Sequence, residues 1–251
     1  MQKSNPWLVF PKPNPQANLR LFCLPYAGGK ASIFQTWPEM LPAEVELCAI
    51  QLPGRSDRLS EPAFTSMPLL IEVMLPHLLS YLDKPFAVFG HSMGGLIGFE
   101  LTRYLRRQHT IQPVCLFMSA CRAPHVSLTY SPLHMLPDSA FKAALRYING
   151  TPEPILQNEA FIDLLLPTLR ADFALSETYR YYEEALLDCS ICVFGGKQDK
   201  LVSYSALNAW QEQTQGQFQL HMLPGDHFFL TSAQLRLVGA ISHELDHLKI
   251  I

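Results

Sequence analysis

Short apolar runs recur along the chain, separated by segments long enough to form helices. This alternation is typical of a parallel sheet whose strands are joined by crossover helices. Strands are predicted at 19–24, 45–52, 86–89, 114–118, 191–194 and 218–223, with a seventh at 7–10. The segments 66–82 and 95–107 carry apolar residues at helical spacing and are predicted to be crossover helices. The sequence therefore predicts an α/β fold with a mostly parallel sheet.

The size and charge of the chain limit its class. Its 251 residues suit one domain, and 48% hydrophobic with 16% charged residues is a globular composition. A formal net charge of −3 provides no basic field for phosphate backbones, so nucleic acid is not expected as a partner. The cluster of Arg103, Arg106 and Arg107 is interpreted as the solvated face of a helix.

The interval 121–188 differs from the other connections. It shows no strand-like alternation and contains prolines at 124, 132, 137, 152, 154 and 167. It is also far longer than an ordinary connection between a helix and a strand. We predict a helical lid at 121–188, inserted within a single domain that spans 1–251.

The compartment follows from the termini and the cysteines. The first 16 residues lack the apolar core of a signal peptide, and no run is long enough to span a bilayer, so a cytoplasmic protein without a membrane partner is expected. Most of the six cysteines lie in or beside apolar runs, where cysteine acts as a small core residue. Cys189 and Cys192 form a CxxC, but strand alternation turns them to opposite faces, and no metal site is predicted.

The strongest signal for chemistry is the segment GHSMGG at 90–95. It places a G-x-S-x-G pattern between a predicted strand and a predicted helix. A serine raised on a sharp strand-to-helix turn needs very small residues two positions away on either side, and Gly90 and Gly94 meet that need. The start of the helix also offers unpaired N–H groups that favour negative charge. Ser92 is therefore predicted to be the nucleophile of an α/β-hydrolase fold.

A serine hydroxyl needs a base and a third group that orients the base. In this fold the acid and then the histidine follow the serine along the chain. Asp199 follows the strand 191–194 through GGKQD, and His227 follows the strand 218–223 through PGDH. The predicted catalytic triad is therefore Ser92, Asp199 and His227.

Other acids and histidines fit less well. After the strand 114–118 no carboxylate occurs until Asp138, so an acid from that strand has no candidate. Asp226 adjoins the histidine and is interpreted as a turn residue. His91 flanks the serine but is expected to point elsewhere. The two N–H donors of the oxyanion hole are predicted to be Met93, after the nucleophile, and Ala27, in the loop PYAGG.

The chain resembles the type II (editing) thioesterases that accompany modular polyketide synthases and nonribosomal peptide synthetases, relatives of the medium-chain thioesterase of fatty-acid synthesis. The resemblance covers nearly the whole chain and rests on LFCLPYAGG with SIF after it, AIQLPGRSDRLSEP, FGHSMGG, LRADFALSETY, GGKQD and LPGDHFFL. Lys30 stands where the family often has a small residue.

This resemblance implies hydrolysis of acyl or aminoacyl thioesters from the phosphopantetheine arm of acyl or peptidyl carrier proteins, in antibiotic biosynthesis, through an acyl-enzyme on Ser92. It carries over Asp199, His227, Ala27 and Met93 in the roles given above. It implies no cofactor beyond the arm that the substrate carries, and a monomer is expected. A medium-chain fatty-acid thioesterase, an oxygen-ester carboxylesterase or lipase, an acyltransferase and a silent binding protein remain alternatives.

The lid is expected to roof a channel for the acyl group. Its apolar residues exceed what one helical layer needs to bury, so some should line that channel. The candidates include Phe161, Leu164, Leu165, Leu166 and Phe173.

Overall fold

The computed structural model describes residues 5–128 and 130–248, so the ends of the predicted domain and residue 129 lie outside the described residues. Its centre is a seven-stranded sheet in the order β1-β3-β2-β4-β5-β6-β7. The strands are β1 (Leu8–Val9), β2 (Leu19–Leu24), β3 (Val45–Ile50), β4 (Phe86–His91), β5 (Cys115–Ser119), β6 (Ser190–Gly196) and β7 (Phe218–Leu223). Only β1 pairs antiparallel, at the edge. The predicted mostly parallel α/β fold is confirmed.

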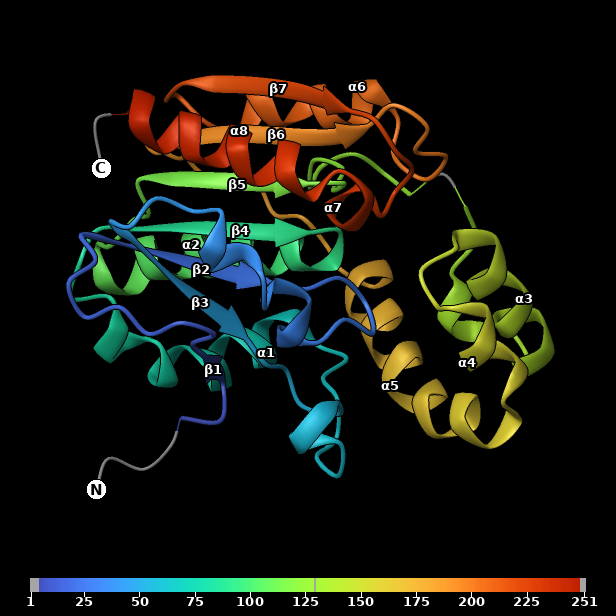
Figure 1. Ribbon diagram of the computed structural model, residues 1–251. Helices are drawn as coiled ribbons and strands as arrows, with labels where there is room; N and C mark the ends of the chain where they lie inside the picture. The colour runs from blue at the N-terminus through green and yellow to red at the C-terminus, as the bar shows by residue number, and fades with distance from the viewer. Residues whose placement is uncertain (1–4, 129, 249–251) are drawn as a thin grey trace.

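Helices cover both faces of this sheet (Figure 1). Phe22 and Val88 pack on one face with α1 (Met67–Met74), α2 (Met93–His109) and α6 (Tyr204–Asn208). Leu21 and Phe89 pack on the other face with α7 (Phe229–Ser232) and α8 (Gln234–His247). Because neighbouring residues of the central strands are buried on opposite faces, these strands read as continuous apolar runs rather than as alternating ones.

The predicted elements differ from the observed ones mainly at their ends. The helix predicted at 66–82 stops at Met74, where Pro76 cannot donate to the preceding turn, and two 3-10 helices follow. The strand predicted at 86–89 continues to His91, because His91 pairs with Ser119 in the neighbouring strand. The 3-10 helices are Ala31–Phe34, Trp37–Glu39, Ser56–Arg58, Leu75–His77, Leu79–Tyr81, Leu133–Met135 and Ala209–Gln213.

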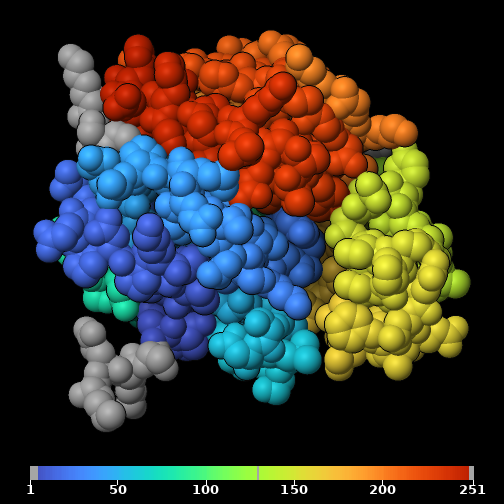
Figure 2. All heavy atoms as spheres, viewed as in Figure 1, coloured from blue at the N-terminus to red at the C-terminus, as the bar shows by residue number. Residues whose placement is uncertain are grey.

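The interval 121–188 contains α3 (Asp138–Ile148), α4 (Glu153–Gln157) and α5 (Glu159–Glu177). These helices lie beyond the carboxyl ends of the parallel strands (Figure 1) and form a lobe beside the main body of the molecule (Figure 2). The lobe has its own apolar cluster, which includes Phe141, Leu145 and Ile162. Pro167 lies inside α5 without ending it.

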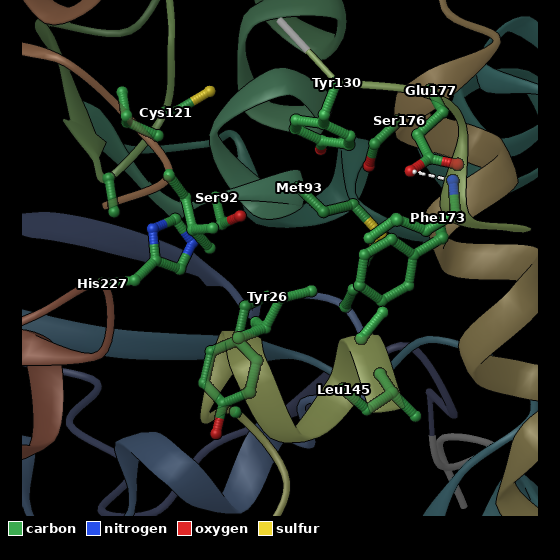
Figure 3. Close-up of a pocket in the computed structure, with 18 of the residues that line it drawn as sticks. Tyr26, Ser92, Met93, Cys121, Tyr130, Leu145, Phe173, Ser176, Glu177 and His227 are labelled. Atoms are coloured by element: carbon green, nitrogen blue, oxygen red, sulfur yellow. Dashed lines mark hydrogen bonds between the residues drawn. The ribbon is translucent and has the colours of Figure 1, made fainter. Parts of the chain in front are cut away.

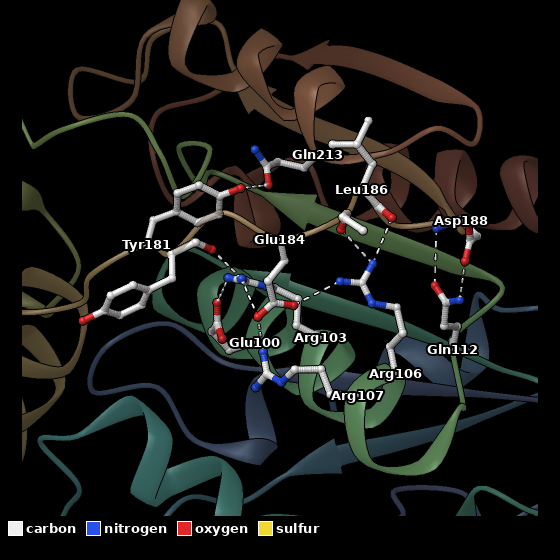
Figure 4. Close-up of polar contacts among 12 residues, drawn as sticks. Glu100, Arg103, Arg106, Arg107, Gln112, Tyr181, Glu184, Leu186, Asp188 and Gln213 are labelled. Carbon is white, nitrogen blue, oxygen red and sulfur yellow. Dashed lines mark hydrogen bonds and ion pairs between the residues drawn. The ribbon is translucent and has the colours of Figure 1, made fainter.

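The sequence predicts that Arg103, Arg106 and Arg107 of α2 form a solvated helix face. The structure instead places all three in ion pairs. The side chain of Arg103 is only 4% exposed and pairs with Glu100 at 2.7 Å and with Glu184 at 2.7 Å. Glu184 also pairs with Arg106 and Arg107 (Figure 4). These ion pairs therefore hold the segment that follows α5, which contains Glu184, against helix α2.

All six cysteines are buried and free. Cys189 and Cys192 pack on opposite faces of the sheet, as predicted. The fold nevertheless brings His221 of β7 and Glu244 of α8 to Cys192, with one ligand atom from each within 4.8 Å of the others. His221 Nε2 lies 3.4 Å from Glu244 Oε1. No sequence pattern predicts this cluster, because the three residues come from separate elements.

Among the described helices, none combines the length and apolar character that a membrane crossing requires.

Candidate active site

Ser92 sits on a strained turn between β4 and α2. Its φ of 53° and ψ of −116° are rarely adopted by a residue with a side chain, and such conformations cost about 1–3 kcal/mol each. A Cβ added at Gly90 would lie 2.2 Å from Gly94 O, and one added at Gly94 would lie 2.3 Å from Leu24 O. Only glycine fits at either position. The turn is further held by the Ser92 N–H, which donates to Ser119 O at 2.7 Å.

Asp199 and His227 meet at the carboxyl ends of β6 and β7. His227 Nδ1 lies 2.9 Å from Asp199 Oδ2, and the aspartate side chain is fully buried. Its other oxygen, Oδ1, accepts hydrogen bonds from the N–H groups of Leu201 at 2.7 Å and Val202 at 3.1 Å. The carboxylate is therefore fixed on both oxygens and orients the ring, leaving Nε2 as the nitrogen free for chemistry.

The neighbouring Asp226 has a different role. Its Oδ1 accepts from the Phe228 N–H at 2.9 Å, which closes a turn of the kind aspartate side chains make with the backbone two residues on. Its Oδ2 accepts from Asn149 Nδ2 at 3.2 Å. Asp226 therefore stabilises the loop that carries His227, whereas Asp199 is the aspartate that contacts the His227 ring.

Ser92 and His227 line one cavity of about 390 Å³. The ring of His227 lies beside Ser92 (Figure 3). No hydrogen bond between Ser92 Oγ and the ring is formed among the described residues; catalytic hydrogen bonds often tighten only when substrate binds. The structure thus joins Asp199 to His227 directly and places Ser92 within the same cavity.

Two residues that line this cavity have backbone N–H groups that donate no hydrogen bond within 5–128 and 130–248, and both were predicted as oxyanion donors. They are Ala27, in the loop after β2, and Met93, in the first turn of α2. The next two N–H groups of the loop are engaged, since Gly28 donates to Asp172 Oδ2 at 2.7 Å and Gly29 donates to Tyr26 O at 2.8 Å. The N–H groups of Ala27 and Met93 can therefore each donate to an oxyanion in this cavity.

His91 has a part that the sequence did not reveal. It is fully buried, and its Nε2 lies 2.9 Å from the backbone oxygen of His227 while its Nδ1 lies 2.9 Å from Ser119 Oγ. Because a carbonyl oxygen only accepts, Nε2 carries the proton and Nδ1 accepts from the serine hydroxyl. Burial, and to a lesser extent the neighbouring His227, holds the pKa of His91 well below its ordinary value. His91 is therefore neutral and holds the backbone of His227 in place through this hydrogen bond.

The far part of the cavity is largely apolar and lies among the helices of 121–188. Its lining includes Ile148 and Leu169. It also includes Leu145 and Phe173, which Figure 3 labels. The carboxylate of Glu177 also reaches this wall but is engaged by the ring of His134 at 2.6 Å and by two backbone N–H groups. The free space therefore suits an apolar chain better than a charged one.

Five apolar residues of 121–188 were named as candidates for the channel wall, and one of them, Phe173, lines the cavity. Phe161 and Leu164 are 41% and 51% exposed, and Leu165 and Leu166 pack in the apolar cluster of the lobe. The face of α5 toward the cavity carries positions 169, 173, 176 and 177, which are spaced at helical intervals. The sequence could not separate Phe173 from the other candidates, because it shows apolar character but not which face of α5 meets the cavity.

The thioesterase domain family matches residues 19–245 of the chain. Linear gramicidin dehydrogenase LgrE of Brevibacillus parabrevis is 44% identical, covering 95% of this chain and 92% of that protein. Gramicidin S biosynthesis protein GrsT of Aneurinibacillus migulanus is 43% identical over 96% of this chain and 94% of that protein. The solved structure of the RedJ thioesterase from the prodiginine pathway of Streptomyces coelicolor superposes with a TM-score of 0.85 at 37% identity, covering 91% of this chain and 87% of that one.

Proposed function

The chain belongs to the thioesterase family, and from this premise we propose that it hydrolyses acyl or aminoacyl thioesters from the phosphopantetheine arm of acyl or peptidyl carrier proteins. The proposed catalytic residues are Ser92, His227 and Asp199. The hydrogen bond of 2.9 Å between His227 and Asp199, in a cavity shared with the strained Ser92, is the observation that carries the proposal.

The proposed reaction has two halves. Ser92 Oγ attacks the thioester carbonyl while His227 Nε2 takes its proton, and the N–H groups of Ala27 and Met93 stabilise the oxyanion. The C–S bond then breaks, and the departing thiolate takes the proton from the imidazolium. A thiol with a pKa of about 8.5 is a weak base, so its departure needs little help from an acid. Water, deprotonated by His227, then attacks the acyl carbonyl; the bond to Ser92 Oγ breaks, the imidazolium returns its proton to Oγ, and the acid is released.

The shape of the cavity supports this substrate class. The reacting groups lie below the helices of 121–188, and the far wall is apolar. We propose that this segment is the lid of a single domain and that the acyl chain lies against α3 and α5. The phosphopantetheine belongs to the substrate, so the proposed enzyme uses no cofactor of its own. We propose that it acts on carrier proteins as a monomer.

The relatives support the biosynthetic setting. GrsT is named for gramicidin S biosynthesis, and RedJ is named as a thioesterase of the prodiginine pathway. The name of LgrE includes dehydrogenase, but this chain has no G-x-G-x-x-G dinucleotide fingerprint, and its first parallel strand leads into PYAGG instead. We therefore propose editing hydrolysis for this chain, with fatty-acid chain termination as the second candidate because the cavity wall is apolar.

The substrate class is tested by offering one acyl group in three forms: on a carrier protein, on free pantetheine and as an oxygen ester. The proposal predicts the highest kcat/KM for the acyl carrier and the lowest for the oxygen ester. Ser92→Ala is the control and should lose ~10³-fold or more of the rate on each form, because triad members act as a unit. An oxygen ester hydrolysed as well as the matching thioester would contradict the proposal.

A further inference from the structure

Arg55 and Asp172, which lie far apart in the sequence, form a buried ion pair outside the proposed triad. Arg55, in the loop after β3, donates from Nη2 to Asp172 Oδ1 and from Nη1 to Asp172 Oδ2, both at 2.7 Å. The side chains are 3% and 2% exposed. Asp172 lies on α5, so the pair joins the helical lobe to the main body. The two parallel hydrogen bonds fix the carboxylate in its plane as well as its position.

The same carboxylate reaches the loop that carries Ala27. Asp172 Oδ2 also accepts the Gly28 N–H at 2.7 Å, and Arg55 Nη1 donates to Gly29 O at 3.3 Å. The ion pair therefore binds this loop through one donor and one acceptor. Helix α5 also packs against the loop, because a Cβ added at Gly28 would lie 2.6 Å from Leu169 Cδ2.

These contacts determine the direction of the Ala27 N–H. That N–H shares a peptide plane with Tyr26 C=O, which accepts from the Gly29 N–H at 2.8 Å. Because the peptide is trans, the hydrogen bond to Tyr26 O turns the Ala27 N–H to the opposite side. Gly28, at a φ of +76°, completes the turn, and its N–H fixes the next peptide plane on Asp172. Both peptide planes that flank the Ala27 Cα are thus held.

We propose that Asp172, held by Arg55, is a positioning residue for the oxyanion hole and couples docking of α5 to catalysis. The inference rests on the proposed function, since it takes Ala27 as an oxyanion donor. Asp172 touches neither Ser92 nor His227 and acts through the Gly28 peptide. When α5 lifts from the body, the loop loses this anchor, so the site is complete only with the lobe in place.

The direct test is Asp172→Asn, which keeps the shape but loses the charge and one acceptor. An asparagine cannot accept from the Arg55 fork and the Gly28 N–H together. Loss of one oxyanion donor costs ~10²–10³-fold in kcat, so a misplaced donor should cost about 10- to 100-fold. KM for acyl-pantetheine should stay within about threefold, because the lost interaction acts in the transition state. Arg55→Lys, which keeps the charge without the fork, should lower kcat by a smaller factor.

The matched control is Glu46→Gln. Glu46 accepts from Arg20 Nε at 2.8 Å in another buried pair, at the amino ends of β2 and β3, away from the cavity. Its loss should lower the melting temperature and leave kcat unchanged.

Each variant is assayed well below its melting temperature, and its affinity is measured for a boronic acid, which mimics the tetrahedral intermediate, and for a thioether analogue of the substrate. The inference predicts that Asp172→Asn lowers the affinity for the boronic acid by the same factor as kcat. The affinity for the thioether analogue should stay unchanged. Unchanged kcat in both Asp172→Asn and Arg55→Lys would overturn it, as would an equal loss in Glu46→Gln. If Ser92→Ala is inactive in the same assays, either of these results leaves the proposed triad standing.

Discussion

Ser92 and its two glycines show how a single residue position depends on backbone contact. The close approaches of Gly90 to Gly94 O and of Gly94 to Leu24 O leave no space for a side chain. They bring the start of α2 against the end of β2, where Ala27 follows. The spacing of the glycines, which is visible in the sequence, therefore reflects the same geometry that places the two proposed oxyanion donors, Ala27 and Met93.

The choice of Asp199 as the catalytic acid is tested by comparing it with Asp226, the other aspartate near His227. Asp199→Asn should lower kcat by ~10³-fold or more, because the amide no longer fixes the tautomer of His227. Asp226→Asn should keep kcat within about threefold, since its carboxylate serves a turn. Steady-state kinetics of the two purified variants decide the matter, and greater damage in the Asp226 variant would show that the acid is misassigned.

His91 is expected to make the stability of the protein depend on pH. Its folded pKa lies well below 6.5, whereas the unfolded chain titrates near 6.5, so only the unfolded state gains a proton as the pH falls below that value. Stability should therefore be full above about pH 6.5 and should decline below it. The lowered pKa values of Glu61, Asp83 and Glu184 add losses only at lower pH, below their ordinary values of 4.5, 3.8 and 4.5.

His91→Gln keeps a donor near His227 O and removes the titration. Melting temperatures measured between about pH 7 and about pH 5 should fall more steeply for the wild type than for this variant. Parallel curves would show that His91 is not the group responsible.

At the scale of elements, α5 combines an inner and an outer face with different expected roles. Phe173→Ala, in the cavity wall, should change the ranking of acyl chain lengths by about 10-fold or more, because each filled or vacated methylene site is worth ~1–3 kcal/mol. Phe161→Ala is the matched control, since Phe161 lies on the same helix and is 41% exposed. The measurement is kcat/KM on short, medium and long acyl carriers. An unchanged ranking for Phe173→Ala would mean that the acyl chain binds elsewhere.

The sequence predicted elements well where the determining pattern is local. The strand at 218–223 was predicted with its observed ends, and the start of α2 was predicted within two residues. Contacts between distant segments were not predictable in this way. The Arg55–Asp172 pair spans 117 residues and the His91–His227 contact spans 136, so no local spacing reports either. For the same reason Arg103 was interpreted as exposed, since its partner Glu184 returns from beyond α5.

At the scale of the whole molecule, the parallel sheet brings distant residues to one edge. β4, β6 and β7 each end near the cavity and supply Ser92, Asp199 and His227, while the helices of 121–188 lie over that edge. The order of these residues along the chain could be predicted because the fold fixes which strand ends meet. The contacts of Asp172 with Gly28 and Arg55, from which the coupling of the lobe to this loop is proposed, could be found only in the structure.

The most direct test of the account follows one acyl group by mass spectrometry during a single turnover. An acylated carrier protein is mixed with the enzyme, quenched at short times, and both proteins are weighed intact and after digestion. The account predicts that the acyl mass leaves the carrier, appears transiently on Ser92 and then disappears as free acid, and that Ser92→Ala leaves the carrier acylated. Release by Ser92→Ala at about a tenth of the wild-type rate or more, or an acyl adduct on another residue, would contradict it.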